Sequence, residues 1–352
     1  MNGAESYLYH QSDKVTLYLG DARQVLSVMP TASVDCVVTS PPYWALRDYG
    51  TGAWHGGDPR CPHTTPPACR RCTAIWRDPQ QGLEPTLDAY LDRLQTAFDE
   101  IARVLTPSGT VWLNLADAYT SSRRRLPGTG KPAGKQLLGV PWRTALRLQE
   151  HGWILRNAII WAKTNPMPSS VKDRFTTTYE HLFLLTRHQR YWFDLDAVRP
   201  SPGQSFATAV RPTAADQPDT AGRTRHGVKA SKHDHPSLPA AAAGTNLRPT
   251  GSRHTAAHRL GRNPGDVWTL PTRPYHGAHV APFPIDLPLR AIAAGCPPAG
   301  VVCDPYSGTS TTGLAALRLG RTYIGIDIHP DHHDQALQRM GRPPTNPSRR
   351  SP

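Results

Sequence analysis

The chain has 352 residues, of which 36 are proline and 28 are glycine, and 38% of its residues are hydrophobic. This composition predicts a packed core interrupted by extended segments. No run of about 18 apolar residues is present, which excludes a transmembrane helix. The N-terminus lacks the basic start and apolar stretch of a signal peptide, so we expect a cytoplasmic protein. The net charge of +13 favours a polyanionic partner.

Short apolar runs and amphipathic stretches alternate along the first 198 residues. Strands are predicted at 15–19, 34–38, 110–115, 154–161 and 179–186, and helices at 22–28, 87–105 and 142–150. The helix over 87–105 has apolar residues at three- and four-residue steps, with Thr86 as its N-cap and Pro107-Ser108-Gly109 as its stop.

The composition changes between residues 199 and 262. This segment contains ten Lys and Arg residues, three Asp residues and one aromatic residue. Such a stretch cannot bury enough apolar surface to order itself alone. Strands are predicted again at 300–303 and 323–328, with a helix at 311–319 and a mobile tail over 341–352. The alternation of strands and helices predicts an α/β fold with a doubly wound, mostly parallel sheet.

Residues 304–313, Asp-Pro-Tyr-Ser-Gly-Thr-Ser-Thr-Thr-Gly, stand where a predicted strand turns into a helix. Small residues let backbone N–H groups approach a ligand, and a helix N-terminus offers unpaired donors to a carboxylate. Asp327 ends the following strand, where an acid commonly accepts hydrogen bonds from ribose hydroxyls. Taken by itself, this motif is also compatible with an ordinary strand-to-helix turn.

A second motif, Thr39-Ser40-Pro41-Pro42-Tyr43-Trp44, follows another predicted strand. The exocyclic amine of a nucleobase is weakly nucleophilic, because its lone pair is delocalised into the ring. The Ser40 hydroxyl and the Pro41 carbonyl can accept its N–H groups, and the two prolines restrict the backbone that carries them. Tyr43 can stack on a base taken out of the duplex. A proline-stiffened turn with two packing aromatic residues is the alternative.

Together the two motifs resemble those of the amino-methyltransferases of DNA. The Pro-Pro-Tyr motif comes first and the cofactor motif last, which is the permuted order of the β group of that family. The resemblance implies one permuted Rossmann-like domain, with residues 13–198 as its catalytic half and 263–340 as its cofactor-binding half. It also implies S-adenosylmethionine as cofactor, double-stranded DNA with a flipped target base as substrate, and a cognate restriction endonuclease as a candidate partner.

The resemblance assigns roles to individual residues. The catalytic residues are Ser40, Pro41, Pro42 and Tyr43, and the cofactor-binding residues are Asp21, His279, Phe283, Asp304, Tyr306, Gly308, Thr309 and Asp327. The turn at Ser40 resembles that of the enzymes that methylate cytosine N4, whereas most members that methylate adenine N6 have Asp or Asn there. Adenine N6 methylation and a catalytically inactive DNA-binding protein are the alternatives. Ser40 and the permuted order argue against methylation of a protein glutamine.

The cofactor turn departs from the family pattern at two positions. Family members usually have Gly-Ser-Gly-Thr-Thr, whereas this chain has Ser310 at the second glycine, and Tyr306 replaces the usual phenylalanine. Because a residue with a Cβ atom resists positive φ, we expect reduced cofactor affinity.

Cys61, His63, Cys69 and Cys72 lie within twelve residues of an insertion over 55–82. Four such ligands suit a closed tetrahedral zinc site with a structural role. A reduced, metal-free loop is the alternative. Cys36, Cys296 and Cys303 stand in apolar surroundings and are predicted to be core thiols.

Two basic segments are candidates for contact with DNA phosphates. Residues 121–135 hold five Lys and Arg residues and no acid, and residues 199–262 lie where the β group keeps its target-recognition region. A basic linker is the alternative for 199–262. The segment 161–166, Trp-Ala-Lys-Thr-Asn-Pro, follows a predicted strand and is a candidate for lining the base pocket.

Overall fold

The computed structural model describes residues 3–64, 66–120, 134–200, 263–273 and 283–341. Apart from 199–200 and 263, they all belong to one compact unit. Nine strands of this unit form a sheet in the order β1-β2-β11-β10-β3-β6-β8-β7-β9. They are β1 (Leu8–Gln11), β2 (Val15–Leu19), β3 (Val34–Thr39), β6 (Leu105–Leu115), β7 (Ile154–Lys163), β8 (Tyr179–Thr186), β9 (Val267–Leu270), β10 (Val301–Asp304) and β11 (Thr322–Asp327).

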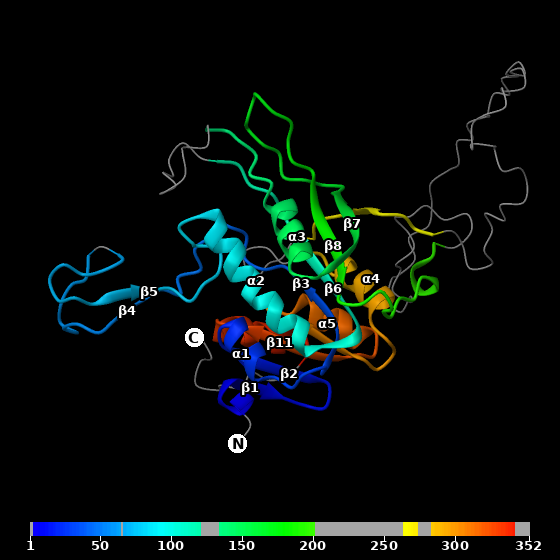
Figure 1. The fold of residues 1–352 in the computed structure, drawn as a ribbon, viewed down its shortest axis with the longest axis horizontal. Helices are drawn as coiled ribbons and strands as arrows, with labels where there is room; N and C mark the ends of the chain where they lie inside the picture. The colour runs from blue at the N-terminus through cyan, green and yellow to red at the C-terminus, as the bar shows by residue number, and fades with distance from the viewer. Residues whose placement is uncertain (1–2, 65, 121–133, 201–262, 274–282, 342–352) are drawn as a thin grey trace, which may run out of the picture. The chain divides into compact units, whose positions relative to one another are not determined.

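The sheet is mixed and mostly parallel. The neighbours β2–β11, β11–β10, β10–β3, β3–β6 and β7–β9 are parallel, and β1–β2, β6–β8 and β8–β7 are antiparallel. The last two described strands, β10 and β11, stand between β2 and β3, which come from the beginning of the chain. Figure 1 shows β11 beside β2. The predicted doubly wound sheet and the predicted permuted order are therefore both confirmed.

Helices cover both faces of the sheet. On one face, α2 (Leu87–Val104) packs between α1 (Ala22–Val28) and α3 (Val140–Glu150). On the other face, α4 (Asp286–Gly295) packs against α5 (Thr311–Arg318), and α6 (Pro330–Arg339) contacts β11. Successive side chains of β6 contact the two helical layers in turn, because the side chains of a strand point alternately to opposite faces of the sheet. Leu113 belongs to the core beneath α2, whereas Thr110 donates to the carbonyl of Gly295 in α4 at 2.8 Å.

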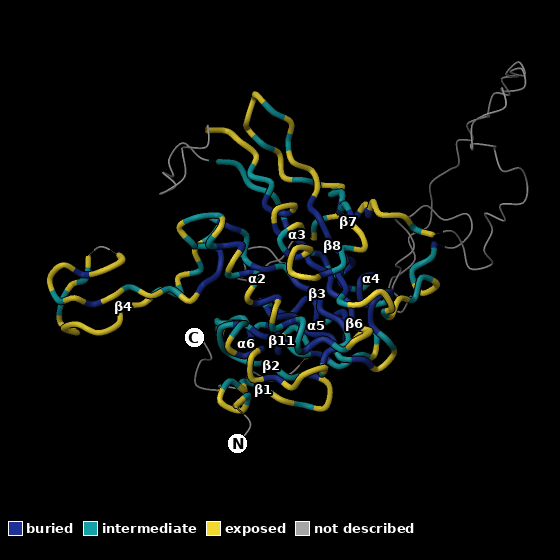
Figure 2. Tube along the Cα trace, viewed as in Figure 1, coloured by how far each residue is buried: buried dark blue, intermediate teal, exposed yellow. Residues whose placement is uncertain are grey.

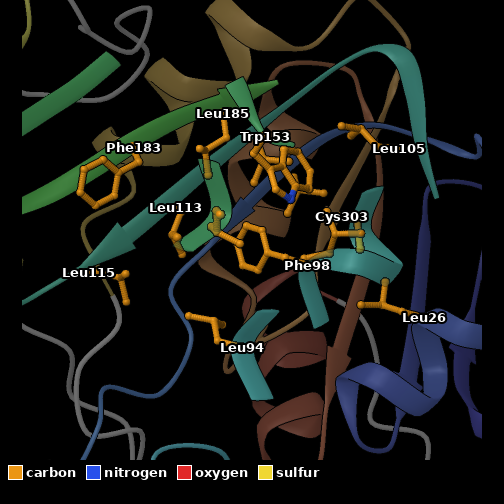
Figure 3. Packing of buried hydrophobic residues seen from close by; sticks show 14 of the residues in the cluster. Leu26, Leu94, Phe98, Leu105, Leu113, Leu115, Trp153, Phe183, Leu185 and Cys303 are labelled. Atoms are coloured by element: carbon orange, nitrogen blue, oxygen red, sulfur yellow. The ribbon is translucent and has the colours of Figure 1, made fainter. Parts of the chain in front are cut away.

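The main core lies between α1–α3 and the central strands. Figure 3 shows Leu94 and Phe98 of α2 beside Leu113, Leu185 and Trp153. The rings of Phe98 and Trp153 meet edge to face, with their centroids 5.8 Å apart. The central strands are buried along most of their length (Figure 2). The predicted core thiols, Cys36, Cys296 and Cys303, are all fully buried.

The predicted helix over 87–105 is present, but its end differs from the prediction. The Thr86 side chain accepts from the backbone N–H of Ala89 at 3.1 Å, as expected of an N-cap. The helix ends at Val104, and Pro107-Ser108-Gly109 lie inside β6 instead of before it. An irregularity in the pairing of β3 with β6 accommodates these residues, because Val34 pairs with Leu105 but Cys36 pairs with Thr110.

The structure contains several elements that the sequence analysis did not predict. They are β1, β9, α4, α6, the hairpin β4 (Ala53–His55) and β5 (Ile75–Arg77), and two short 3-10 helices, η1 (Gly3–Tyr7) and η2 (Asp196–Val198). The hairpin strands β4 and β5 are antiparallel and lie inside the cysteine-containing insertion. Within the described residues, no helix is both long and apolar enough to cross a membrane.

Candidate functional site

The two motifs meet where the connections of the sheet change direction. From β10 the chain passes through α5 to β11 on one side, and from β3 it passes through α2 to β6 on the other. Ligands of such sheets bind outside the carboxyl ends of the strands at this point. A cavity of about 600 Å³ lies there, and both the 40–43 turn and the 304–309 turn line it. Two motifs far apart in sequence therefore form one site.

Asp304 joins the two turns directly. Its carboxylate accepts from Thr39 Oγ1 at 2.7 Å, from Thr312 Oγ1 at 2.7 Å and from the backbone N–H of Tyr306 at 3.1 Å. The residue is 2% exposed. Burial raises the pKa of Asp304 to about 6, although the hydrogen bonds from Thr312 and Thr39 act in the opposite direction. Asp304 thus holds the residue before Ser40 against the start of the cofactor turn.

The 304–313 turn contains a residue with a left-handed backbone conformation. Ser310, at the position where the family usually has glycine, has φ 55° and ψ 48° and is the residue before α5. A Cβ atom is unfavourable in this left-handed region. The Ser310 hydroxyl accepts from Tyr323 OH at 3.2 Å, and both side chains are fully buried. The serine is therefore tolerated at a strained position, where its side chain has a buried partner.

Two further acids predicted to hold the cofactor line the cavity. Asp327, at the end of β11, accepts from the backbone N–H of Gly308 at 2.8 Å and contacts His332 Nδ1 at 3.0 Å. Burial alone would raise the pKa of Asp327, but the contacts with His332 outweigh it and hold the pKa below its usual value. Asp21 caps α1 and pairs with Arg23 at 3.1 Å and Arg93 at 3.2 Å.

The remaining predicted cofactor residues differ in what the structure describes. Tyr306, Gly308, Thr309 and Phe283 all line the cavity. His279 lies outside the described residues, as do 121–133 and 201–262 of the two basic segments.

Residues that the sequence analysis did not single out also contribute to the cavity wall. Tyr306 OH lies 2.5 Å from Gln81 Oε1. Among the described residues, Gln81 Nε2 and His329 Nε2 are buried without a hydrogen-bond partner, and both residues line the cavity. Buried polar atoms are normally satisfied, so these atoms indicate that a polar ligand binds here. Neither residue lies in a motif that would have predicted this.

The turn at Ser40 is fixed by bonds from several elements. Tyr90 OH in α2 donates to the carbonyl of Pro42 at 3.2 Å, and Trp44 Nε1 donates to the carbonyl of Glu84 at 3.0 Å. Tyr43 OH contacts Glu180 Oε2 at 2.7 Å, and Glu180 comes from β8. Trp161 and Lys163 also line the cavity, but both lie within β7 and not after it. The turn is therefore held from the helical layer and from the sheet.

The predicted metal ligands lie together in the insertion. One ligand atom from each of Cys61, His63, Cys69 and Cys72 lies within 4.8 Å of the other three. Cys61 Sγ and Cys69 Sγ are 3.8 Å apart, and Cys72 Sγ lies 3.3 Å from His63 Nδ1. A disulfide would place two sulfur atoms about 2.05 Å apart. Two thiolates of a tetrahedral site, each about 2.3 Å from the zinc ion, would instead stand about 3.8 Å from each other.

We predict that the charge of Asp304 opposes folding at neutral pH. Because its pKa is raised in the folded protein, the stability that its proton provides is complete below the unfolded pKa near 4 and is lost as the pH rises through 6. Denaturant unfolding of Asp304→Asn and wild type from pH 4 to pH 7 should show the wild type losing about 3 kcal/mol relative to the variant. Parallel curves would contradict this. Asp327→Asn is the control: because the pKa of Asp327 is lowered in the folded protein, its difference from wild type should stay nearly constant from pH 7 to pH 5 and decrease only as the pH falls through the unfolded pKa near 4.

We also predict that Ser310→Gly is more stable than Ser310→Ala by about 1 kcal/mol. Both variants lose the hydroxyl that accepts from Tyr323, but only glycine removes the Cβ atom from the left-handed conformation. Chemical denaturation of the two variants measures the difference. Equal stabilities would show that the turn relaxes around the side chain without strain.

Comparison with known proteins is consistent with this site. Residues 34–338 match the model of a family described as DNA methylase. The Type II methyltransferase M.Cfr9I of Citrobacter freundii is 35% identical over 347 residues, covering 94% of this chain and 89% of the relative. The Type II methyltransferase M.SfiI of Streptomyces fimbriatus is 30% identical, covering 94% of this chain and 92% of the relative.

Two solved structures share the fold. The PvuII DNA methyltransferase, named as cytosine-N4-specific, has a TM-score of 0.57 at 16% identity and covers 94% of this chain and 87% of its own. A candidate DNA modification methylase from Thermus thermophilus, complexed with S-adenosyl-L-methionine, has a TM-score of 0.53 at 22% identity over 92% of each chain. This chain belongs to the DNA amino-methyltransferase family, as established by the family match, by relatives that align over most of their length, and by the two motifs that line one cavity.

Proposed function

We propose that this protein transfers the methyl group of S-adenosylmethionine to the exocyclic N4 amine of cytosine in DNA. One observation carries the proposal: the Ser40–Tyr43 turn and the 304–309 turn line the same cavity, and Asp304 bonds to the residue that precedes Ser40. An acceptor base and a methyl donor bound at these two turns would lie next to each other.

The chemistry follows from the weak nucleophilicity of an exocyclic amine. Acceptors against its N–H groups favour a pyramidal nitrogen with a lone pair that can attack. The Ser40 hydroxyl and the Pro41 carbonyl are the acceptors that we propose, because both residues line the cavity and the Pro41–Pro42 backbone is rigid. Bound S-adenosylmethionine supplies an already electrophilic methyl group. Alignment of the amine therefore matters more than a strong base.

Tyr43 is proposed to hold the target base. A base in a duplex cannot reach an enclosed site, so it must be flipped out and stacked on a side chain. The cavity of about 600 Å³ is within the usual range for small-molecule sites. Tyr43 lines it, and its hydroxyl is anchored through Glu180.

The cofactor is proposed to occupy the other half of the cavity. The residues that would hold it are Asp21, Phe283, Asp304, Tyr306, Gly308, Thr309 and Asp327, all of which line the cavity. The unpartnered Nε2 atoms of Gln81 and His329 support a ligand there. Asp327 is the proposed partner of a ribose hydroxyl, since its carboxylate has about four lone-pair sites and Gly308, His329 and His332 use three of them.

Cytosine is proposed over adenine because of Ser40. Most N6-adenine members of the family have a carboxylate or amide side chain at this position, and a serine resembles the N4-cytosine members. Nucleoside mass spectrometry of DNA from cells that express the protein separates the two products. N4-methylcytosine supports the proposal, N6-methyladenine would reassign the base, and the absence of both would leave a DNA-binding protein without activity.

We predict that Ser40→Ala lowers the single-turnover methylation rate by about 100-fold or more, since one preorganised hydrogen-bonding group is lost. The affinity for S-adenosylmethionine should not change, because Ser40 makes no bond to the cofactor turn. Incorporation of a radiolabelled methyl group into DNA measures the rate, and calorimetry measures the affinity. Ser27→Ala, at an exposed position of α1, is the control. A wild-type rate in Ser40→Ala would reject Ser40 as a catalytic residue.

We further propose that Cys61, His63, Cys69 and Cys72 bind one structural zinc ion. The 3.8 Å separation of Cys61 Sγ and Cys69 Sγ supports tetrahedral coordination. The hydrogen bond with His63, and next those from the backbone N–H groups of Arg71 and Cys72, lower the pKa of Cys69, which favours the thiolate that zinc binds. Four protein ligands would close the site, so the ion would take no part in methyl transfer.

Protein purified under reducing conditions without chelator should contain about one equivalent of zinc, as elemental analysis would measure. The double variant Cys69→Ser with Cys72→Ser should lose it, because two of the four ligands are removed. Cys296→Ala should keep it, since this buried thiol lies at the end of α4. A zinc-free wild type would reject the metal site and leave the proposed methyltransferase activity untouched.

The proposed partner is double-stranded DNA, with a cognate restriction endonuclease as a second candidate that the Type II names of the relatives suggest. We propose 199–262 as the target-recognition region on its charge and its place in the chain. Within 121–135, Lys135 is described, and it pairs with Asp173 at 2.6 Å.

A further inference from the structure

A chain of hydrogen bonds connects the catalytic turn to an ion pair in the cavity wall. Ser40 Oγ lies 3.2 Å from Tyr43 OH, and Tyr43 OH lies 2.7 Å from Glu180 Oε2. Lys163 Nζ lies 2.6 Å from Glu180 Oε1. All four residues line the cavity. The chain therefore starts at the atom that we propose accepts from the substrate amine.

Counting hydrogens shows which atom is the donor in each of these hydrogen bonds. A carboxylate only accepts hydrogen bonds and a lysine ammonium only donates them. The single hydroxyl hydrogen of Tyr43 must therefore point at Glu180. The Tyr43 oxygen then offers only lone pairs to Ser40, so Ser40 is the donor of that bond. Burial, and next the charge of Glu180, raise the pKa of Tyr43 well above its usual value, so Tyr43 keeps its hydrogen at neutral pH.

The carboxylate that fixes this direction stands on the sheet and not on a loop. Glu180 lies on β8 and pairs in register with Trp161 of β7, two residues before Lys163. On the other side, Asn114 of β6 donates from Nδ2 to the carbonyl of His181 at 3.1 Å. Its Oδ1 is thereby turned toward Tyr43 OH at 3.3 Å, as a longer second acceptor. Two neighbouring strands, β6 and β8, thus present acceptors to one tyrosine hydroxyl, and a third, β7, supplies the lysine that pairs with Glu180.

We propose that Glu180 is a positioning residue that, held by Lys163, directs the Tyr43 and Ser40 hydroxyl hydrogens away from the substrate. The Ser40 oxygen then faces the substrate amine with lone pairs alone. A serine hydroxyl is otherwise both donor and acceptor, and a hydrogen turned toward the amine would oppose the attack of its lone pair. The inference rests on the proposed function, because it requires an amine to be bound at Ser40.

An ion pair between neighbouring strands can also serve stability alone. The two roles differ in what they affect. A stabilising pair changes the unfolding temperature and affects binding and catalysis together. A pair that orients Ser40 changes the rate of the chemical step and leaves both affinities as they are, whatever its removal does to folding stability. It also acts only while the Tyr43 hydroxyl is present to transmit the direction.

The test uses Glu180→Gln, which keeps the volume of the side chain. A glutamine amide can donate to the Tyr43 oxygen as well as accept from it, so the direction of the chain is no longer fixed. The single-turnover rate should fall about 10-fold or more. The probe is genomic DNA from a methylation-deficient strain, with the full-length enzyme in excess and a radiolabelled methyl donor. Affinities for this DNA and for S-adenosylmethionine should match wild type, whereas the unfolding temperature should fall, because Lys163 keeps its charge without its partner.

Two comparisons complete the experiment. Glu100→Gln makes the same chemical change in an ion pair with Arg103, at 2.8 Å within α2 and outside the cavity, and should keep the wild-type rate. In a double-mutant cycle, Tyr43→Phe should lower the rate, and adding Glu180→Gln should lower it no further. This non-additivity would show that Glu180 acts through the Tyr43 hydroxyl.

Three outcomes would overturn the inference. They are a wild-type rate in Glu180→Gln, a loss that falls equally on the rate and the affinities, and additive effects in the cycle. A wild-type enzyme that methylates no DNA would instead reject the proposed function. The two failures are distinguishable, because wild type is measured beside every variant.

Discussion

The buried carboxylate of Asp304 is the group on which the arrangement of the site depends. It accepts from Thr39 at the end of β3, from Thr312 in α5 and from the backbone of Tyr306. A buried acid costs free energy unless its lone pairs have donors, so these partners cannot be changed independently. One group therefore sets the distance between the turn proposed to bind the base and the turn proposed to bind the cofactor. Methyl transfer needs that distance to be fixed, because attack must be in line.

Sheet pairing explains how the permuted order keeps this geometry. Thr39 and Asp304 are 265 residues apart in sequence, yet β3 and β10 are parallel neighbours with Cys303 beside Val37. Parallel strands need no direct connection, so the segment with β10 and β11 can follow the segment with β3 in the chain and still lie inside the sheet. The arrangement makes the central pairing highly non-local, and such topologies fold slowly because a long loop must close first.

The sequence predicts those features that depend on a local pattern of residues. It does not predict the features that depend on the pairing of distant strands. The apolar spacing of 87–105 predicted α2, and the missing glycine at Ser310 predicted a strained turn that is present at φ 55°. The network at Tyr43 could not be predicted. It depends on the register of β8 against its neighbours, and a strand that is buried along nearly all of its length gives no sign that Glu180 faces a cavity. The hairpin β4–β5 was missed because three-residue strands have no measurable period.

The insertion that carries the cysteine cluster is also part of the wall of the proposed cofactor site. The side-chain amide of Gln80 links the two ends of the insertion. It accepts from the backbone N–H of Tyr49 at 2.7 Å and donates to the carbonyl of Arg47 at 2.7 Å. The next residue, Gln81, contacts Tyr306 OH at 2.5 Å. Gln80, which anchors the insertion, is thus adjacent in sequence to Gln81, which contacts the side chain of Tyr306. A displacement of Gln80 and Gln81 would therefore break these bonds and alter the contact with Tyr306, so the anchor of the insertion and the wall of the cavity share neighbouring residues.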